Sequence, residues 1–475
     1  MADLNTPLLG LANALKDDPG IIGSIGKRST VVAAPEAARA LTLGAISDQS
    51  GRVPLVVCVP TTAEAERLRA DLSIYLGADE VALFPAWETL PFERISPNVE
   101  TMGRRLEVLW RLQDPARTPK VVVASARSLV QRLGPGIDEL EPITVGVGDQ
   151  VDVEELVHSL VASGYRREPQ VESRGHFAVR GSIVDVFPST ADAPVRVDLW
   201  GDEVDRLSEF GVNDQRSTIT RSEVVIHPAR EVVASEEIME RAEELVATEP
   251  WGREHWERLA SGAFFDGMES WLPWLTDKDS VLIDHVDADA LIVLIEPRRL
   301  RDRAADIGEE EADLAGTLAK TWGAVSEDGD GDEEFPRLHV PFDRILEHSE
   351  CPLWTMTTAP EGPDVAVVAA TGWETPLGDP PPLVRQLQQL LADGYQVVVG
   401  ADGVGTAPRL AVLLADHGVH LPVRETLDEK SAGESCIVVA PLERGAVFTS
   451  SKIAVMSESD PVSYTHLTLP TIYSV

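Results

Sequence analysis

The segment from Val31 to Leu41, VVAAPEAARAL, has the form of the strand, turn and helix that open a nucleotide-binding domain. A working phosphate loop reads G-x-x-x-x-G-K-[ST]; its glycines let backbone N–H groups approach the phosphates, its lysine supplies charge and its hydroxyl binds magnesium. The same eight positions here hold Ala33, Ala34, Pro35, Glu36, Ala37, Ala38, Arg39 and Ala40. The segment therefore has the frame of such a domain without the residues of its phosphate chemistry.

Most of the changes in this turn oppose nucleotide binding. Glu36 would face phosphate with like charge, and Ala40 offers magnesium no hydroxyl. The Cβ atoms of Ala37 and Ala38 lie where the backbone must approach a phosphate closely. Arg39 keeps a positive charge but cannot rebuild the cradle. We predict an ordinary strand, turn and helix, with no catalytic or nucleotide-binding residue and no cofactor in this chain.

The overall composition limits the classes of function. The 475 residues are enough for three or four domains. Lys and Arg number 41 against 79 Asp and Glu, and the formal net charge of -38 repels phosphate backbones, so general nucleic-acid binding is not expected. No apolar run is long enough to span a membrane, and the N-terminus lacks a signal peptide's basic start and cleavage site. We expect a cytoplasmic protein.

The sequence pattern changes three times along the chain. Residues 1–145 alternate short apolar runs with amphipathic helices, which predicts a parallel sheet with crossover helices. Residues 146–230 contain one helix and then alternate apolar and polar residues at period two, which predicts a small antiparallel α+β insert. Residues 231–345 continue the first α/β domain, and residues 346–460 form a further small α/β domain. The expected strands include 31–35, 53–60, 80–85, 120–126, 280–286 and 290–297, with helices over 62–77 and 99–114.

Two segments are not expected to belong to a folded core. Residues 326–336, SEDGDGDEEFP, predict an acidic, solvated linker and not a calcium loop, because the glutamate at loop position 12 is absent. Residues 461–475 lack charge and helical period, and we interpret them as a non-native tail on a truncated chain.

Three further patterns are interpreted as having no ligand. The pair His348 and Cys351, and the group Asp416, His417 and His420, lack a second pair of ligands, so no metal site is expected. The glycines of GADGVGT, residues 400–406, are interpreted as turn residues because no lysine follows them.

Four phrases in order carry a family resemblance: FPAWETLPFERISPNVETMGRRL (84–106), VVVASARSLVQRLGP (121–135), RGHFAVRGSIVDVFP followed by VRVDLWGDEVDRLSEFGVNDQRS (174–217), and FDGMESWLP (265–273). They resemble the excision-repair helicase subunit UvrB and, more closely, the N-terminal part of the transcription-repair coupling factor (Mfd) family. The resemblance implies a degenerate P-loop helicase-like parallel sheet, with an inserted domain that docks UvrA and a further small α/β domain.

Two more comparisons favour the Mfd family over UvrB. UvrB-like proteins carry D-E-S-H at the end of a core strand, whereas the matching strand here ends in Glu296 and Pro297, and proline can neither accept a proton nor orient water. The long aromatic hairpin with which UvrB holds DNA is replaced by a short segment, so Trp87 and Phe92 are expected in core and turn packing.

Arginines gather in the insert of this acidic chain. By strand periodicity, Arg180 and Asp185 are expected on opposite faces, so some arginines must be exposed. Arginine suits bidentate contact with carboxylates and is enriched in binding hot spots, although pairing with acids of the insert remains an alternative. The resemblance places UvrA binding on Arg166, Arg180 and Phe187, with Arg174 and Arg196 as second choices.

The resemblance implies a recruiting arm that brings UvrA to RNA polymerase stalled at DNA lesions and restrains a motor. ATP and magnesium, together with RNA polymerase and double-stranded DNA, would be bound by downstream domains outside this chain; the full-length protein would be the ATP hydrolase. Two alternatives stay open: a nucleotide-dependent UvrB-like helicase subunit, which predicts nucleotide binding at residues 33–40, and an intramolecular autoinhibitory scaffold, which predicts no affinity for UvrA.

Overall fold

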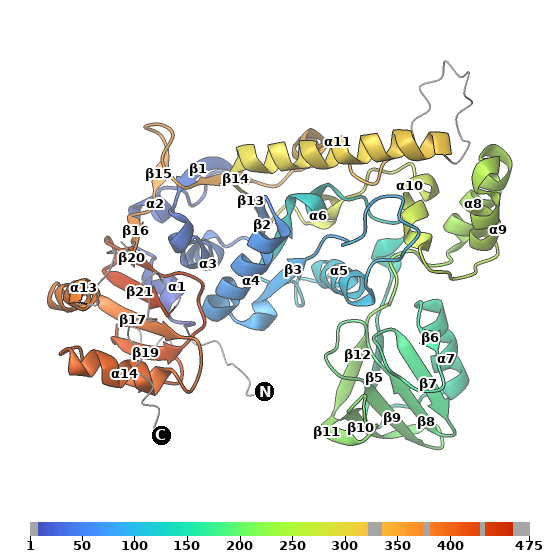
Figure 1. Cartoon of the computed structure of the whole chain (residues 1–475), viewed down its shortest axis with the longest axis horizontal. Coiled ribbons are helices and arrows are strands. Elements are labelled where there is room, and N and C mark those ends of the chain that lie inside the picture. The colour runs from blue at the N-terminus through green and yellow to red at the C-terminus, as the bar shows by residue number, and fades with distance from the viewer. Residues whose placement is uncertain (1–7, 322–334, 374–380, 428–432, 459–475) are drawn as a thin grey trace, which may run out of the picture.

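A computed structural model describes residues 8–321, 335–373, 381–427 and 433–458 (Figure 1). The expected tail at 461–475 lies outside the described residues. So does the expected acidic linker at 326–336, except for Phe335 and Pro336.

A sheet of seven parallel strands forms the centre of the first unit, in the order β15-β1-β14-β13-β2-β4-β3. Every residue of β2, β4 and β13 is buried, as is typical of parallel strands covered on both faces. Alternate residues of β2 belong to two different core clusters, with Val57 on one face and Cys58 on the other. The strands are β1 Ser29–Ala33, β2 Leu55–Val59, β3 Val81–Phe84, β4 Val121–Ser125, β13 Leu291–Ile295, β14 Leu353–Thr357 and β15 Ala366–Val367.

Helices cover both faces of this sheet, and the longest, α11, runs along the top of the view in Figure 1. Thr61 caps α4 through a reciprocal bond with Glu64, which fixes where that helix begins. The helices are α1 Leu11–Ala14, α2 Pro19–Ile22, α3 Arg39–Ser50, α4 Thr62–Leu76, α5 Val99–Leu112, α6 Ala126–Val130, α11 Pro297–Thr321 and α12 Phe342–His348.

The strand expected at 280–286 is wrong. The segment forms a 3-10 turn, Leu282–His285, in which the Asp284 carboxylate accepts the Val281 N–H at 2.9 Å. Leu282 and Ile283 still fill the core beneath the sheet. A short apolar run predicts burial but does not by itself distinguish a strand from a buried turn.

The insert forms a separate lobe at the lower right of Figure 1, and its antiparallel core agrees with the expectation. Its sheet has the order β11-β10-β9-β8-β7-β6, with a separate β5–β12 pair where the chain enters and leaves. Its elements are β5 Ile143–Gly146, α7 Val153–Ala162, β6 Arg166–Arg167, β7 His176–Arg180, β8 Ile183–Val186, β9 Val195–Trp200, β10 Glu203–Phe210, β11 Ser217–Arg221 and β12 Glu223–Ile226.

A helical segment with α8 Glu236–Thr248, α9 Arg253–Ala260 and α10 Leu272–Leu275 follows the insert. Its tryptophans form a buried aromatic cluster that also includes Trp87 and Phe92, which are only 4% and 5% exposed. The expectation that these two side chains serve packing is confirmed.

The expected boundary at residue 346 is wrong, because β14 lies between β1 and β13 and belongs to the first sheet. The chain leaves that sheet only after β15. The last unit has a second sheet in the order β16-β20-β21-β17-β19-β18, at the lower left of Figure 1. Its elements are β16 Ala370–Gly372, α13 Pro381–Ala392, β17 Gln396–Ala401, α14 Ala407–Asp416, β18 Val423–Arg424, β19 Cys436–Val439, β20 Ala446–Phe448 and β21 Ile453–Ser457.

The first and last units share one apolar core. Leu8, Leu11 and Leu15, near the start of the chain, are fully buried in a cluster that includes Val32 of the first sheet and Val455 of the last. Burial of side chains from both sheets in one cluster stabilises their mutual placement.

Candidate functional site

The turn that would bind phosphate in a nucleotide-binding domain is occupied by the protein's own ion pair. After β1, residues Glu36–Ala38 form a 3-10 turn, and α3 begins at Arg39. Arg39 is only 8% exposed; its guanidinium is bonded to the Glu296 carboxylate and, at 2.8 Å, to the Thr358 hydroxyl. The positive charge that the turn retains is therefore neutralised within the protein.

Glu296, the acid that remains at the end of β13, is held as a carboxylate. Burial opposes its ionisation, but hydrogen bonds from Thr358 and Arg39, with the charge of Arg39, keep its pKa below the usual range. Its φ of 49° is unusual for a residue with a side chain, and Pro297 follows directly at the start of α11. The two remnants of a nucleotide site, Arg39 and Glu296, thus bind each other.

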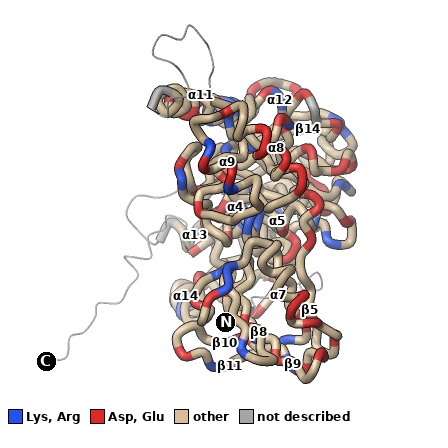
Figure 2. The backbone as a smooth tube through the Cα atoms, turned by 90° about the vertical axis from the view of Figure 1, so that its right-hand side faces the viewer, with Lys and Arg blue, Asp and Glu red and all other residues tan. Residues whose placement is uncertain are grey.

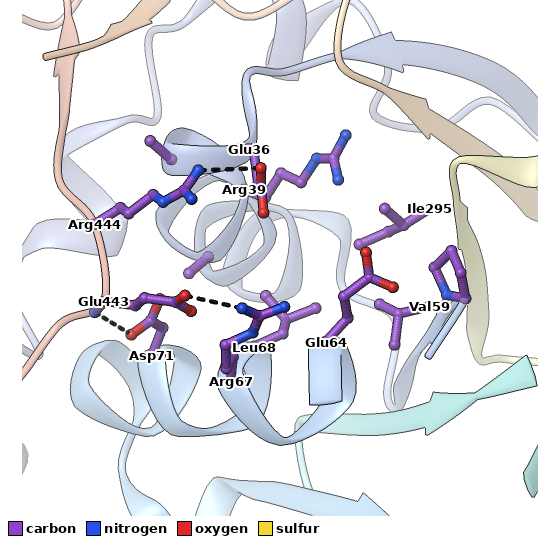
Figure 3. Close-up of a pocket in the computed structure, with 13 residues that line it drawn as sticks. Glu36, Arg39, Val59, Glu64, Arg67, Leu68, Asp71, Ile295, Glu443 and Arg444 are labelled. Atoms are coloured by element: carbon purple, nitrogen blue, oxygen red, sulfur yellow. Dashed lines mark hydrogen bonds and ion pairs between the residues drawn. The ribbon is translucent and has the colours of Figure 1, made fainter. Parts of the chain in front are cut away.

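A loop of the last unit closes the pocket beside this turn (Figure 3). Arg444 pairs with Glu36 at 3.2 Å, and the Glu443 carboxylate pairs with Arg67 of α4 at 3.1 Å. The Glu443 backbone N–H also donates to Asp71 at 3.0 Å. Carboxylates outnumber guanidinium groups in the lining: the acids are Glu36, Glu64, Asp71 and Glu443, and the arginines are Arg39, Arg67 and Arg444. This arrangement disfavours a phosphate group.

The glycine-rich loop at 400–406 is also acidic. Its Asp402 N–H donates to the Glu458 carboxylate at 2.8 Å, and burial, with the charge of Glu458, raises the pKa of Asp402. Gly403 and Thr406 close a turn before α14. A negative charge already bonded to this backbone does not fit a phosphate-binding role.

The insert differs because one face of its sheet is open at the outer end, which carries the exposed Arg180, although Ala178 and Asp185 on the same face are buried. Alternate residues such as Phe177, Val184 and Val197 pack in the core cluster that includes α7. Their neighbours along each strand face the other way, and cross-strand partners on this open face include Asp185 with Arg196. The hairpin between β7 and β8 also pairs Arg180 with Ile183, so Arg180 and Asp185 share this face. The expectation that they lie on opposite faces is wrong, because the chain reverses between them.

The five residues predicted for UvrA docking have different surroundings. Arg166 and Arg180 are exposed, and Arg180 donates only to the Pro169 carbonyl, at 3.0 Å. Within the described parts of the chain, neither makes an ion pair, and the same holds for exposed Arg167. Arg196 holds Asp185 bidentately at 2.7 and 2.9 Å.

The other two, Arg174 and Phe187, already make contacts within the protein. Arg174 pairs with Glu100 of α5 and with Asp192, both at 3.3 Å, and its guanidinium lies 5.4 Å from the Phe187 ring centroid. Phe187 is 7% exposed and packs with Phe210 in a small cluster. Among the residues that the structure describes, intramolecular ion pairing, the alternative left open by the sequence, therefore applies to Arg174 and Arg196 but not to Arg166 and Arg180.

Sequence reasoning did not select Trp200 or Arg206, which also lie on the open face of the insert. Trp200 is 84% exposed at the end of β9, and Arg206 pairs with Asp198 at 2.9 Å. The available signal was the tight turn Trp200-Gly201-Asp202, because a tryptophan beside such a turn has little core within reach.

Buried polar contacts fix the insert to the first unit. Arg105 of α5 and Glu231, just after the insert, are both 0% exposed and pair at 2.7 Å, while the Trp87 indole N–H donates to the same carboxylate at 2.8 Å. Burial raises the pKa of Glu231, opposed chiefly by the charge of Arg105. A Cβ at Gly103 would lie 2.4 Å from the Ser189 hydroxyl, so α5 requires a glycine at this contact. These contacts form the base of the insert and hold the open face in a fixed position relative to the first unit.

Comparison with known proteins identifies two parts of this architecture. Residues 143–232 match the UvrB interaction domain, and residues 394–460 match the MFD D3 domain. The transcription-repair-coupling factor of Mycobacterium tuberculosis is 32% identical over 96% of this chain and 39% of its own length. Those of Haemophilus influenzae and Bacillus subtilis are 27% and 24% identical, each over 89% of this chain and 37% of their own length.

The chain therefore spans about two fifths of the length of these curated relatives. The matched UvrB interaction domain coincides with the insert that carries the open arginine face. Within the described residues, no helix is long and apolar enough to cross a membrane.

Proposed function

We propose that this chain, which belongs to the family of transcription-repair-coupling factors and corresponds to their N-terminal part, is the arm that docks UvrA. The observation that carries this proposal is the open face of the insert, which lies within the match to the UvrB interaction domain. Arg166 and Arg180 are exposed there without ion-pair partners among the described residues, in a chain with a formal net charge of -38. Unpaired guanidinium groups fit a partner surface that carries carboxylates.

In the longer relatives, this arm would bring UvrA to an RNA polymerase stalled at a DNA lesion. Their name, transcription-repair-coupling factor, supports that setting. ATP hydrolysis, DNA translocation and polymerase contact are assigned in this proposal to the part of those proteins beyond this chain. The arm would also restrain that motor until UvrA or polymerase binds.

The test is calorimetric titration of UvrA into the whole chain and into an Arg180→Glu variant. We expect the reversal to weaken binding by about 30-fold or more, which corresponds to the loss at a typical interface hot spot. Arg409→Glu is the matched control, because Arg409 is an exposed arginine on α14 of the last unit. Its variant should bind UvrA within about twofold of the unaltered chain, since isolated surface changes have small effects.

The same experiment distinguishes the alternatives. No binding of UvrA by a folded chain would overturn the docking proposal and favour the intramolecular scaffold. Heat on titration of ATP with magnesium would favour the nucleotide-dependent helicase subunit, and would contradict the prediction from Arg39 and Glu296 that no nucleotide binds.

A further inference from the structure

Trp200 is the most exposed large apolar side chain among the described residues, at 84%. Exposing a tryptophan to water forgoes the large stabilisation that its burial would give. Scattered apolar side chains on a surface need no explanation, but a tryptophan exposed to this extent on a rigid element points to a partner.

The strand end that carries Trp200 is held firmly. The turn at Gly201-Asp202 returns the chain into β10, and the loop before α7 braces it through three backbone hydrogen bonds. Gly148 N–H donates to the Val204 carbonyl at 2.8 Å, Val204 N–H to Asp149 at 2.9 Å, and Val151 N–H to Asp202 at 2.7 Å. An ordered anchor loses less conformational entropy on binding than a mobile one.

The strand register places Trp200 on the same face as Arg180, which has no ion-pair partner among the described residues. Arg180 of β7 pairs with Ile183 of β8, Ile183 pairs with Asp198 of β9, and Asp198 pairs with Arg206 of β10. Trp200 lies two residues beyond Asp198 on the same strand, and therefore on the same face. From strand spacing and rise, the Cα atoms of Arg180 and Trp200 are roughly 12 Å apart. One standard interface covers that span.

This end of the open face is also directed away from the first unit. Ser189, which contacts Gly103 of α5, follows the end of β8 that pairs with the beginning of β9. Trp200 is at the opposite end of β9. A large partner could reach it without meeting the body of the protein.

We propose that Trp200, with the half-buried Ile183 beside it, is the apolar anchor of the UvrA-docking surface. It inserts into an apolar pocket on UvrA whose border carries carboxylates that meet Arg180. This inference rests on the proposed function, because it assigns the anchor to the same partner. Tryptophan and arginine are the residues most enriched at interface hot spots, where aromatic anchors fill desolvated pockets.

The test is calorimetric titration of UvrA into the chain carrying Trp200→Ala or Trp200→Phe, alongside the unaltered chain and Arg180→Glu. We expect Trp200→Ala to weaken binding by about 30-fold or more, and Trp200→Phe to retain most of the affinity. Val412→Ala is the matched control, because Val412 is 64% exposed on α14 of the last unit, and it should change affinity by less than about twofold. Circular dichroism would verify that each variant is folded.

The outcomes separate the two proposals. If Arg180→Glu loses UvrA while Trp200→Ala binds like the unaltered chain, the docking function stands and the anchor is overturned. If the unaltered, folded chain does not bind UvrA, both fail. Sedimentation of the chain alone tests another occupant: a self-association that Trp200→Ala abolishes, without change in UvrA affinity, would assign the anchor to a second copy and overturn the UvrA pocket.

Discussion

The degenerate nucleotide face of the first sheet and the open face of the insert both carry arginines, in opposite surroundings. On the first, Arg39, Arg67 and Arg444 each hold a carboxylate of the same chain. On the second, Arg166 and Arg180 hold none among the described residues, although acids are abundant in the sequence. The charge distribution of the chain is visible in Figure 2, where acidic positions recur along most of the backbone.

The surroundings of an arginine therefore indicate its availability to a partner better than its presence in the sequence does. A guanidinium bonded to its own chain has already met its carboxylate, so a partner must displace that contact before it can bind. An exposed guanidinium loses water but breaks no ion pair when a partner arrives. The ion pairs of the nucleotide face therefore join the first and last units. The open face of the insert is the surface that remains available to a partner.

The largest effect is expected from the same contrast between Arg105, at the base of the insert, and Arg180, at its outer end. Arg105→Met should destabilise the chain by about 3–5 kcal/mol, because it leaves the Glu231 carboxylate buried and unpaired. Arg180→Met should change stability by less than about 0.5 kcal/mol. Urea unfolding followed by tryptophan fluorescence measures both, since Trp87 contacts Glu231.

A double variant, Arg105→Met with Glu231→Gln, controls for the buried charge. It should recover part of the stability, because no unpaired carboxylate remains. Equal losses of stability for Arg105→Met and Arg180→Met would contradict the contrast between the two arginines, since the exposed arginine would then also be structural.

A smaller effect on stability is expected from His227, which lies at the base of the insert. The residue is 4% exposed and its ring packs against Trp110. Burial, assisted by the charge of Arg111, lowers its pKa from 6.5 to about 4. As the pH falls below 6.5, His227 becomes protonated in the unfolded chain but stays neutral in the folded chain. The free energy of unfolding is therefore highest above pH 6.5 with respect to this group, and it decreases as the pH falls towards 4. The loss should reach about 3 kcal/mol at most.

Unfolding free energies of the unaltered chain and of His227→Leu, measured across that pH range, check the prediction. The difference between the two proteins should change with pH, and most of the change should lie between 6.5 and 4. The hydrogen bonds from Tyr165 and Ser189 go to the His227 backbone carbonyl, so the substitution leaves them in place. Parallel curves of unfolding free energy against pH would show that burial at the base of the insert does not keep the ring neutral.

The sequence predicted the parts of the fold that local patterns determine. Buried apolar runs gave β2, β4 and β13, and period-two alternation gave the antiparallel insert. The return of β14 to the middle of the first sheet could not be predicted, because it depends on which strands become neighbours. The strand predicted at 280–286 was wrong for a related reason, because a buried turn and a buried strand can contain the same apolar residues.

For the site, composition and resemblance predicted where arginines gather but not which of them are free. The pairing of Arg196 with Asp185 depends on the register between β8 and β9, which no local pattern specifies. The exposure of Trp200 depends on the hairpin ending beyond the core. The contact of Arg39 with Glu296 joins positions far apart in sequence and follows from the order of strands in the sheet.

The smallest effect is expected at the joint on the nucleotide face. Arg67 and Glu443 are 50% and 39% exposed, and their ion pair joins α4 to the last unit. Arg67→Glu should therefore destabilise that contact by less than about 1 kcal/mol, as solvent screens an exposed pair. Hydrogen exchange of the loop around Glu443 and Arg444 is the sensitive readout, because it reports local opening without unfolding the chain.

The charge-swapped variant, Arg67→Glu with Glu443→Arg, is the matched control. It should restore most of the protection lost in Arg67→Glu, since the pair is reformed with its ends exchanged. UvrA affinity should be unchanged in both proteins, because the Arg67–Glu443 pair joins the first and last units and does not lie on the open face of the insert. Weaker UvrA binding by Arg67→Glu, recovered in the swap, would contradict the separation of the two arginine faces and would mean that the joint transmits to the insert.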